Sequence, residues 1–104
     1  MSDAVIKRIM PHDREAEQSV IGSMLMDKDA IVVASGMLNK DDFYAKQYGI
    51  LFTAMVELYN AAKPVDLVTL KAKLQEMDVP EEISNMEYMV DIVNNTYTSA
   101  NIRE

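Results

Sequence analysis

Apolar residues recur at three- and four-residue intervals along most of this chain, and this spacing constrains its fold more than any other feature. Such intervals place apolar side chains on one face of an α-helix, whereas a half-buried strand needs strict alternation. The β-branched runs at residues 31–33 and 90–93 lie within longer stretches of helical spacing. We therefore predict an all-α fold, a compact bundle of about five to six short helices.

Capping residues and a proline set the expected helix boundaries. Asp13, Asp27 and Asp66 are predicted N-caps, because a short carboxylate accepts hydrogen bonds from the free N–H groups of a first turn. The helix with the strongest apolar stripe is predicted at about residues 47–62, ended by Pro64, and is expected to be central. The aromatic pair at residues 43–44 follows a polar turn and is expected to fill the core.

The C-terminal part of the chain carries more turn signals. Residues 78–83 place a proline among acids and are predicted to form a loop, after which Ser84 and Glu87 stand at capping-box spacing. Residues 94–98 predict a further turn, and Thr98 or Ser99 is expected to cap a last helix that reaches Glu104 after barely two turns. Because so short a helix is unstable alone, we expect it to continue in a longer protein.

A length of 104 residues suits one domain with one core. Residues 1–10 show no periodic pattern and are followed by Pro11, which predicts a flexible N-terminal arm. Residues 11–97 are predicted to form the globular helical head, and residues 98–104 the start of the last helix.

The charge of the chain favours protein partners. The net charge is −7, and no Lys or Arg lies between Leu74 and Ile102. Nucleic acids are bound through cationic side chains that neutralise phosphates, so direct nucleic-acid binding is not expected. A surface of this sign suits a basic protein partner. The candidate protein-interaction residues are Glu81, Glu82, Glu87 and Asp91.

The sequence shows no catalytic, cofactor-binding or metal-binding constellation. Its three glycines, Gly22, Gly36 and Gly49, are too dispersed for a phosphate-binding loop. The single histidine, His12, stands beside Pro11, where a capping or surface role is favoured over catalysis, and there is no cysteine. No signal peptide or apolar run long enough to span a membrane is found, so a cytoplasmic location is expected.

Nine methionines and five tyrosines leave two interpretations open. Exposed methionines form adaptable partner-binding surfaces, and exposed tyrosines stack on nucleic-acid bases. We favour core packing, because most of the methionines fall on apolar stripes and the tyrosines lack neighbouring basic grooves. The six methionines on stripes are Met24, Met37, Met55, Met77, Met86 and Met89.

An ordered set of short motifs resembles the N-terminal domain of DnaB-type bacterial replicative helicases. The motifs are Glu15-Ala16-Glu17-Gln18-Ser19-Val20-Ile21-Gly22, Asp42-Phe43-Tyr44, Ile50-Leu51-Phe52, Pro64-Val65-Asp66-Leu67-Val68-Thr69-Leu70, Glu87-Tyr88-Met89 and Ser99-Ala100-Asn101-Ile102. The resemblance covers about residues 11–104. The chain departs from the family where Tyr48-Gly49 replace histidine and arginine, Ser84-Asn85 a double glycine, and Tyr97 a proline.

The resemblance implies a function in assembly. Similar domains form a collar on a hexameric helicase ring, pair through a helical hairpin that follows the head, and recruit a DnaG-type primase. The resemblance also implies a linker and a RecA-like ATPase domain after Glu104, so that ATP and Mg²⁺ serve the full-length helicase and not this chain. We expect the isolated chain to be a monomer or a weak dimer.

Three alternatives stay open. The chain could bind a helicase loader, which the sequence does not separate from primase docking. It could be a DNA-binding module with Lys7, Arg8 and Arg14 as a basic arm and Lys71 and Lys73 as a patch, although its acidic charge disfavours this. An enzyme of another type is the weakest alternative, because no acid, base and nucleophile can be combined from these residues.

Overall fold

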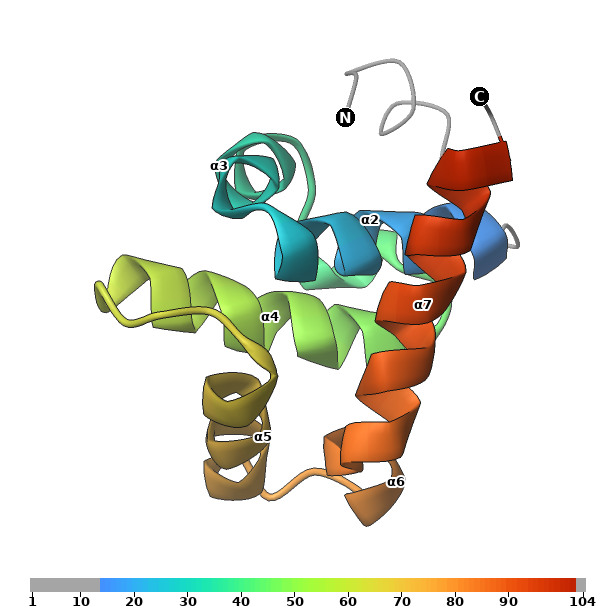
Figure 1. The fold of residues 1–104 in the computed structure, drawn as a ribbon. Coiled ribbons are helices and arrows are strands. Elements are labelled where there is room, and N and C mark those ends of the chain that lie inside the picture. The colour runs from blue at the N-terminus through green and yellow to red at the C-terminus, as the bar shows by residue number, and fades with distance from the viewer. Residues whose placement is uncertain (1–13, 103–104) are drawn as a thin grey trace.

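The computed structural model of the protein describes residues 14–102, and the side chains of residues 15–96. The described part is helical and contains no strand, which confirms the predicted all-α fold. The predicted arm at residues 1–10 and the predicted cap Asp13 lie outside the described residues. The elements are α2 (Arg14–Met26), α3 (Lys28–Met37), the 3₁₀ helix η1 (Lys40–Asp42), α4 (Lys46–Asn60), α5 (Leu67–Glu76), α6 (Glu81–Ser84) and α7 (Met86–Ile102) (Figure 1).

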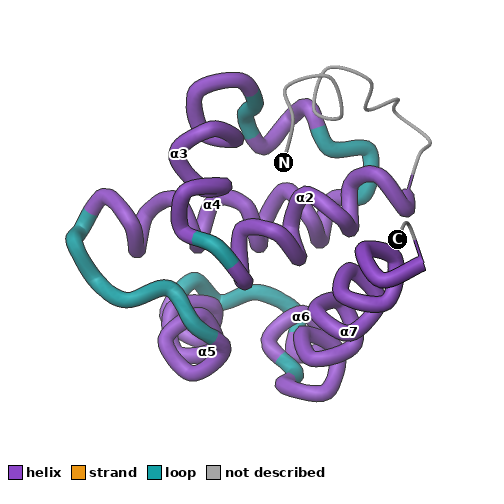
Figure 2. The backbone as a smooth tube through the Cα atoms, turned by 45° about the horizontal axis from the view of Figure 1, so that its top comes forward, coloured by secondary structure: helices purple, strands orange, loops and turns teal. Residues whose placement is uncertain are grey.

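Helices α2 and α4 form the centre of the bundle. They pack on each other, and α3 packs against both (Figure 1). On the other side of α4 lie α5 and the short α6, while α7 crosses α2 and also contacts α5 and α6. Figure 2 shows that the longest loops precede and follow α5. The prediction of α4 as a central helix is therefore confirmed.

The core is built from the apolar stripes that the spacing predicts. Most of its fully buried side chains are aliphatic or methionine, and they come from all the long helices. Three of the six striped methionines, Met24, Met55 and Met89, are at most 1% exposed, as predicted for core packing. Met37 is 36% exposed at the end of α3, so its predicted burial is wrong. The largest fully buried side chains include Ile21, Ile31, Leu51, Leu70, Leu74 and Ile92.

Two predicted N-caps are confirmed. The Asp27 carboxylate accepts a hydrogen bond from the Asp29 N–H at 2.9 Å and caps α3. Asp66 caps α5 through a reciprocal pair, because its carboxylate accepts from the Thr69 N–H at 2.9 Å and its own N–H donates to Thr69 Oγ1 at 3.0 Å. Each of the two carboxylates satisfies a first-turn N–H group that the helix itself leaves free.

Helix α4 ends by its own hydrogen bonding before Pro64 is reached. The Ala62 N–H donates to the Tyr59 carbonyl and the Lys63 N–H to the Leu58 carbonyl, both at 3.0 Å. This is a Schellman motif, and it places Ala62 in the left-handed region at φ 60°. The helix therefore stops at Asn60, two residues before the predicted end.

The predicted loop at residues 78–83 is partly wrong. Asp78 adopts φ 57°, which ends α5, but Glu81–Ser84 forms the one-turn helix α6 with Pro80 at its N-cap. Burial of Ile83, which is 8% exposed, requires that turn to face the core. Asn85, rather than Ser84, caps α7, because its side-chain oxygen accepts from the Glu87 N–H at 2.8 Å and the Tyr88 N–H at 3.3 Å.

The predicted turn at residues 94–98 does not form, because α7 continues through it to Ile102. Thr96 donates its hydroxyl to the Ile92 carbonyl at 2.9 Å, which satisfies that hydroxyl within the helix. Gly22 of α2 lies against the same side chain, and a Cβ built on Gly22 would stand 2.6 Å from Thr96 Cβ. Packing of α7 on α2 thus overrides the local turn preference of these residues.

Candidate functional site

A buried carboxylate fixes the segment that leads into α4. Glu17 lies on α2 and is 0% exposed. Its two oxygens accept hydrogen bonds from the Tyr44 N–H at 2.7 Å and the Ala45 N–H at 3.1 Å. Ala45 is the N-cap residue of α4 and has no side-chain cap of its own. Glu17 therefore satisfies the N–H groups of the segment just before α4 and ties α2 to the start of that helix.

The hydrogen bonds to Glu17 also hold the side chain of Tyr44 at the surface. Phe43 is 6% exposed and packs on Phe52, with ring centroids 5.3 Å apart. Tyr44 is 63% exposed, so the prediction that both aromatic residues fill the core is half wrong. Consecutive residues in an extended segment point to opposite sides, and both bonds to Glu17 fix which one faces inward.

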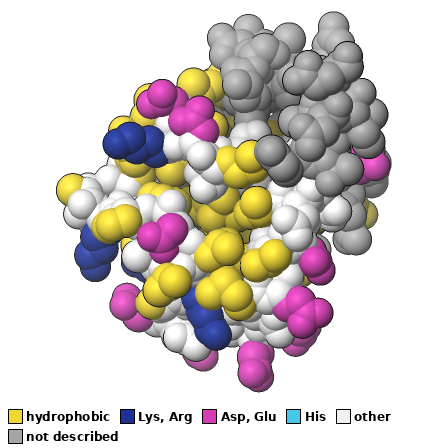
Figure 3. All heavy atoms as spheres, in the orientation of Figure 1, with side chains coloured by type: hydrophobic (Ala, Val, Ile, Leu, Met, Phe, Trp, Pro, Cys, Tyr) yellow, Lys and Arg dark blue, Asp and Glu magenta, His cyan; other side chains and the backbone are white. Residues whose placement is uncertain are grey.

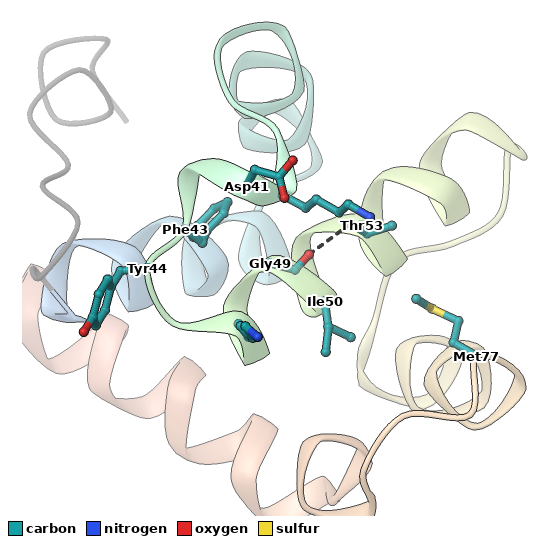
Figure 4. Close-up of a pocket in the computed structure, with 9 residues that line it drawn as sticks. Asp41, Phe43, Tyr44, Gly49, Ile50, Thr53 and Met77 are labelled. Atoms are coloured by element: carbon teal, nitrogen blue, oxygen red, sulfur yellow. Dashed lines mark hydrogen bonds between the residues drawn. The ribbon is translucent and has the colours of Figure 1, made fainter.

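A hollow of about 460 Å³ opens beside this segment and is here called the η1–α4 hollow. It lies between η1, the first half of α4 and the end of α5, and Figure 4 shows Ile50 and Met77 extending into the same space from the two helices. Its lining includes Lys40, Phe43, Tyr44, Lys46, Ile50 and Met77.

The four predicted interaction residues share one region. Glu81 and Glu82 form the first turn of α6, and Glu87 and Asp91 lie one turn apart near the start of α7. All four are exposed, and Figure 3 shows acidic side chains gathering over α6 and the lower part of α7. No described Lys or Arg forms an ion pair with them, so this acidic stretch carries uncompensated charge.

The lysine patch considered for DNA binding is partly neutralised. Lys73 Nζ lies 2.8 Å from Glu57 Oε1, so this ion pair joins α5 to α4. The side-chain hydrogen bond with Glu57 raises the pKa of Lys73 and keeps the ammonium charged. Lys71 stands two residues away and is half-buried. The other proposed cations, Lys7, Arg8 and the side chain of Arg14, lie outside the described residues.

Other kinds of site receive no support within the described part of the chain. No group of three or more His, Cys, Asp or Glu side chains is placed there to hold a metal ion. His12 lies outside that part. None of the described helices is both long and apolar enough to cross a membrane.

The sequence predicted neither the buried hydrogen bonds of Glu17 to the segment before α4 nor the η1–α4 hollow. Glu15 and Glu17 both stand in the first turn of α2, and nothing in local sequence distinguishes the buried Glu17 from the exposed Glu15. Local sequence carries no signal for this contact, because the hydrogen bonds join residues 27 and 28 positions apart.

Comparison with known proteins gives closely related sequences. The replicative DNA helicase DnaC of Bacillus subtilis (strain 168) is 38% identical over 102 residues, which are 98% of this chain and 22% of that protein. The replicative DNA helicase DnaB of Geobacillus stearothermophilus is 37% identical over 102 residues, again 98% and 22% of the two chains. The chain thus spans about a fifth of the length of these curated relatives.

A solved structure and a family model agree with these relatives. The crystal structure of the N-terminal domain of DnaB helicase from Mycobacterium tuberculosis matches with a TM-score of 0.77 and 33% identity, over 84% of this chain and 60% of that one. The family described as the DnaB-like helicase N terminal domain matches residues 9–104. This chain therefore belongs to the family of DnaB-like helicase N-terminal domains.

Proposed function

We propose that this chain is a non-catalytic docking and ring-assembly domain of a replicative DNA helicase that acts in DNA replication. The observation that carries the proposal is the match of residues 9–104 to the DnaB-like helicase N terminal domain, which is about a fifth of the length of its helicase relatives. In the full-length protein, the domain would form part of a collar on a hexameric ring and pair with its neighbours through a hairpin following Glu104. The expected location is the bacterial cytoplasm at the replication fork.

Nucleotide chemistry is assigned to the rest of the helicase. ATP and Mg²⁺ would bind a RecA-like domain there, where hydrolysis drives unwinding. The three glycines of this chain lie inside helices, Gly22 in α2, Gly36 in α3 and Gly49 in α4, rather than in a loop before a helix. A phosphate-binding loop needs its free N–H groups at a helix N-terminus, and these positions do not supply them.

The proposed partner is a DnaG-type primase, docked on the acidic stretch formed by Glu81, Glu82, Glu87 and Asp91. These exposed side chains have no described cationic neighbour, so a basic partner would gain attraction without having to break ion pairs. Docking would act through proximity: a tethered primase stays at high local concentration near the unwound strand even when each contact is weak.

Calorimetric titration of the cognate primase C-terminal domain tests this proposal. The 104-residue chain and a chain extended past Glu104 through the hairpin are titrated separately. Binding by the short chain, weakened by salt, is the expected result. Binding by the extended chain alone would move the docking surface off the described domain. Binding by neither would contradict primase docking and favour a helicase loader as the partner.

Charge-reversal variants locate the surface. Glu81→Lys with Glu82→Lys is expected to weaken primase binding on the order of tenfold, since each contact between charges contributes up to about 1 kcal/mol at a protein surface. Glu15→Lys with Asp29→Lys is the matched control, because both residues are exposed acids on other helices and the net charge changes equally. Equal effects of the two pairs would show that only overall charge matters.

Direct DNA binding remains a second candidate that the structure disfavours. Lys73 already pairs with Glu57, so the patch at Lys71 and Lys73 offers less free charge than the sequence suggests. A salt-sensitive mobility shift of labelled single-stranded DNA would support this candidate, and no shift at low salt is the expected result.

A further inference from the structure

We propose that the η1–α4 hollow is a docking site for an acidic, amphipathic helical segment of a partner protein that inserts one or two apolar side chains. The inference rests on the proposed docking function and adds the chemistry of a second partner surface, distinct from the acidic stretch. Its volume of about 460 Å³ is large enough for a few side chains and lies within the range of ligand-binding pockets.

The hollow has an apolar interior. Phe43, which is 6% exposed, lines the hollow together with the half-buried side chains of Ile50 and Met77 (Figure 4). Tyr44, with 63% of its surface exposed, stands at the edge. A large exposed aromatic side chain beside apolar ones is typical of the residues that contribute most to protein interfaces.

The walls of the hollow are held rigidly. Asn39 and Asp42 close η1 by a reciprocal cap: the Asp41 N–H donates to the Asn39 side-chain oxygen at 2.9 Å, and the Asn39 N–H donates to the Asp42 carboxylate at 2.8 Å. A Cβ built on Gly49 would lie 2.7 Å from the Lys40 carbonyl oxygen, so η1 and α4 are in close backbone contact. Together with the Glu17 bonds to the segment before α4, these contacts preform the site and reduce the entropy lost on binding.

Charge selects the occupant. Lys40 and Lys46 both line the hollow, opposed there by Asp41 alone, in a chain with a net charge of −7. Both lysines are exposed, and neither forms an ion pair with a described residue. A partner carboxylate beside each lysine would therefore add attraction, whereas a basic segment would be repelled. Two cations are too few to hold a nucleic-acid backbone, and the apolar interior does not suit one.

A helical segment fits the shape better than a small molecule. The hollow is open along α4 from Lys46 to Thr53, which is about two turns or roughly 11 Å. An amphipathic helix presents apolar side chains at i and i+3 or i+4 over this length, with acidic residues on its flanks.

Selection from a displayed library of 16-residue helical peptides tests the proposal, with the 104-residue chain as target and randomised positions on one face. The expected peptides are acidic and carry Leu, Phe or Trp at i and i+4. Lys40→Glu with Lys46→Glu is expected to weaken their binding on the order of tenfold, because both flanking charges become repulsive. Lys28→Glu with Lys63→Glu is the matched control, reversing two exposed lysines outside this hollow, and should leave binding within twofold.

Tyr44→Ala tests the apolar contact separately, because it leaves the charge of the hollow unchanged. It is expected to weaken peptide binding at least tenfold, and a thermal scan checks that the variant is folded. Selection of basic peptides, equal losses in the two lysine pairs, or no loss in Tyr44→Ala would overturn the hollow as the site. Concentration-dependent dimers that Lys40→Glu with Lys46→Glu abolishes would instead assign it to a second copy of this chain. The calorimetric titration with primase contains no peptides. A lack of primase binding there would contradict the proposed function without deciding whether the hollow binds acidic helices.

Discussion

Replacing Glu17 by Gln is expected to destabilise the fold strongly, because Glu17 holds the segment that leads into α4. The carboxylate is 0% exposed and accepts from two backbone N–H groups, of Tyr44 at 2.7 Å and of Ala45 at 3.1 Å. A hydrogen bond to a charged group contributes about 1.5–3 kcal/mol. Gln keeps one acceptor oxygen but turns an NH₂ toward the other N–H, so the expected loss is about 2–3 kcal/mol.

This loss is large for a domain of this size. It corresponds to a fall in melting temperature of roughly 10–20 °C, at about 4–8 °C per kcal/mol. Urea unfolding followed by far-UV circular dichroism measures the free energy of unfolding, and amide hydrogen exchange should become faster at Tyr44 and Ala45 in particular. Glu15→Gln is the matched control: it changes the same residue type in the same first turn at an exposed position, and should cost within about 0.5 kcal/mol.

Two outcomes would refute this reasoning. A loss below about 1 kcal/mol in Glu17→Gln would mean that the two N–H groups find other acceptors or water. Equal losses in Glu17→Gln and Glu15→Gln would mean that the negative charge acts on the N-terminus of α2 and not on the start of α4.

Three further predictions follow from helix packing and capping. Gly22→Ala should destabilise by about 1–3 kcal/mol because its Cβ would overlap α7, whereas Gly36→Ala, with nothing within 4 Å of the added Cβ, should stabilise by roughly 0.5–1 kcal/mol; thermal unfolding of the pair checks this. Asn85→Ala should cost about 1 kcal/mol as the loss of the α7 cap, and an unchanged free energy of unfolding in urea would contradict that assignment. The backbone N–H of Thr69 lowers the pKa of Asp66 below its usual 3.8, so the stabilisation by the ionised carboxylate is complete above that value and is lost as pH falls through the lower folded pKa. Asp66→Asn should remove this part of the acid dependence, and an unchanged pH profile of unfolding would contradict it.

The helices and their caps were predictable where the signals are local. The spacing of apolar residues shows which side of a helix faces the core. The caps Asp27 and Asp66 accept hydrogen bonds from N–H groups within three residues of themselves. The stripe of α4 and its central place followed from the same spacing.

The errors arose where distant contacts decide the conformation. Residues 94–98 have turn preferences, yet Gly22 lets α7 pack closely on α2 and keeps that segment helical. Ser84 matches a capping-box pattern, but burial of Ile83 draws the preceding residues into α6, and the cap moves to Asn85. Helix boundaries of this kind depend on tertiary packing, which local propensity does not contain.

The candidate site was predictable only in part. The acidic stretch could be located from the missing Lys and Arg, and the structure shows its four residues exposed over α6 and α7. The η1–α4 hollow could not be predicted, because it joins Lys40, Ile50 and Met77 from three elements that only the fold brings together.

The proposal that this domain docks a protein partner is tested most directly by hydrogen-exchange mass spectrometry. The chain extended past Glu104 is measured with and without a saturating amount of the cognate primase C-terminal domain. Both the globular head and the hairpin are then available to bind primase. The predicted result is slowed exchange over α6 and the first turns of α7, which carry Glu81, Glu82, Glu87 and Asp91. Slowed exchange confined to residues beyond Glu104, with residues 14–102 unchanged, would contradict docking on this domain.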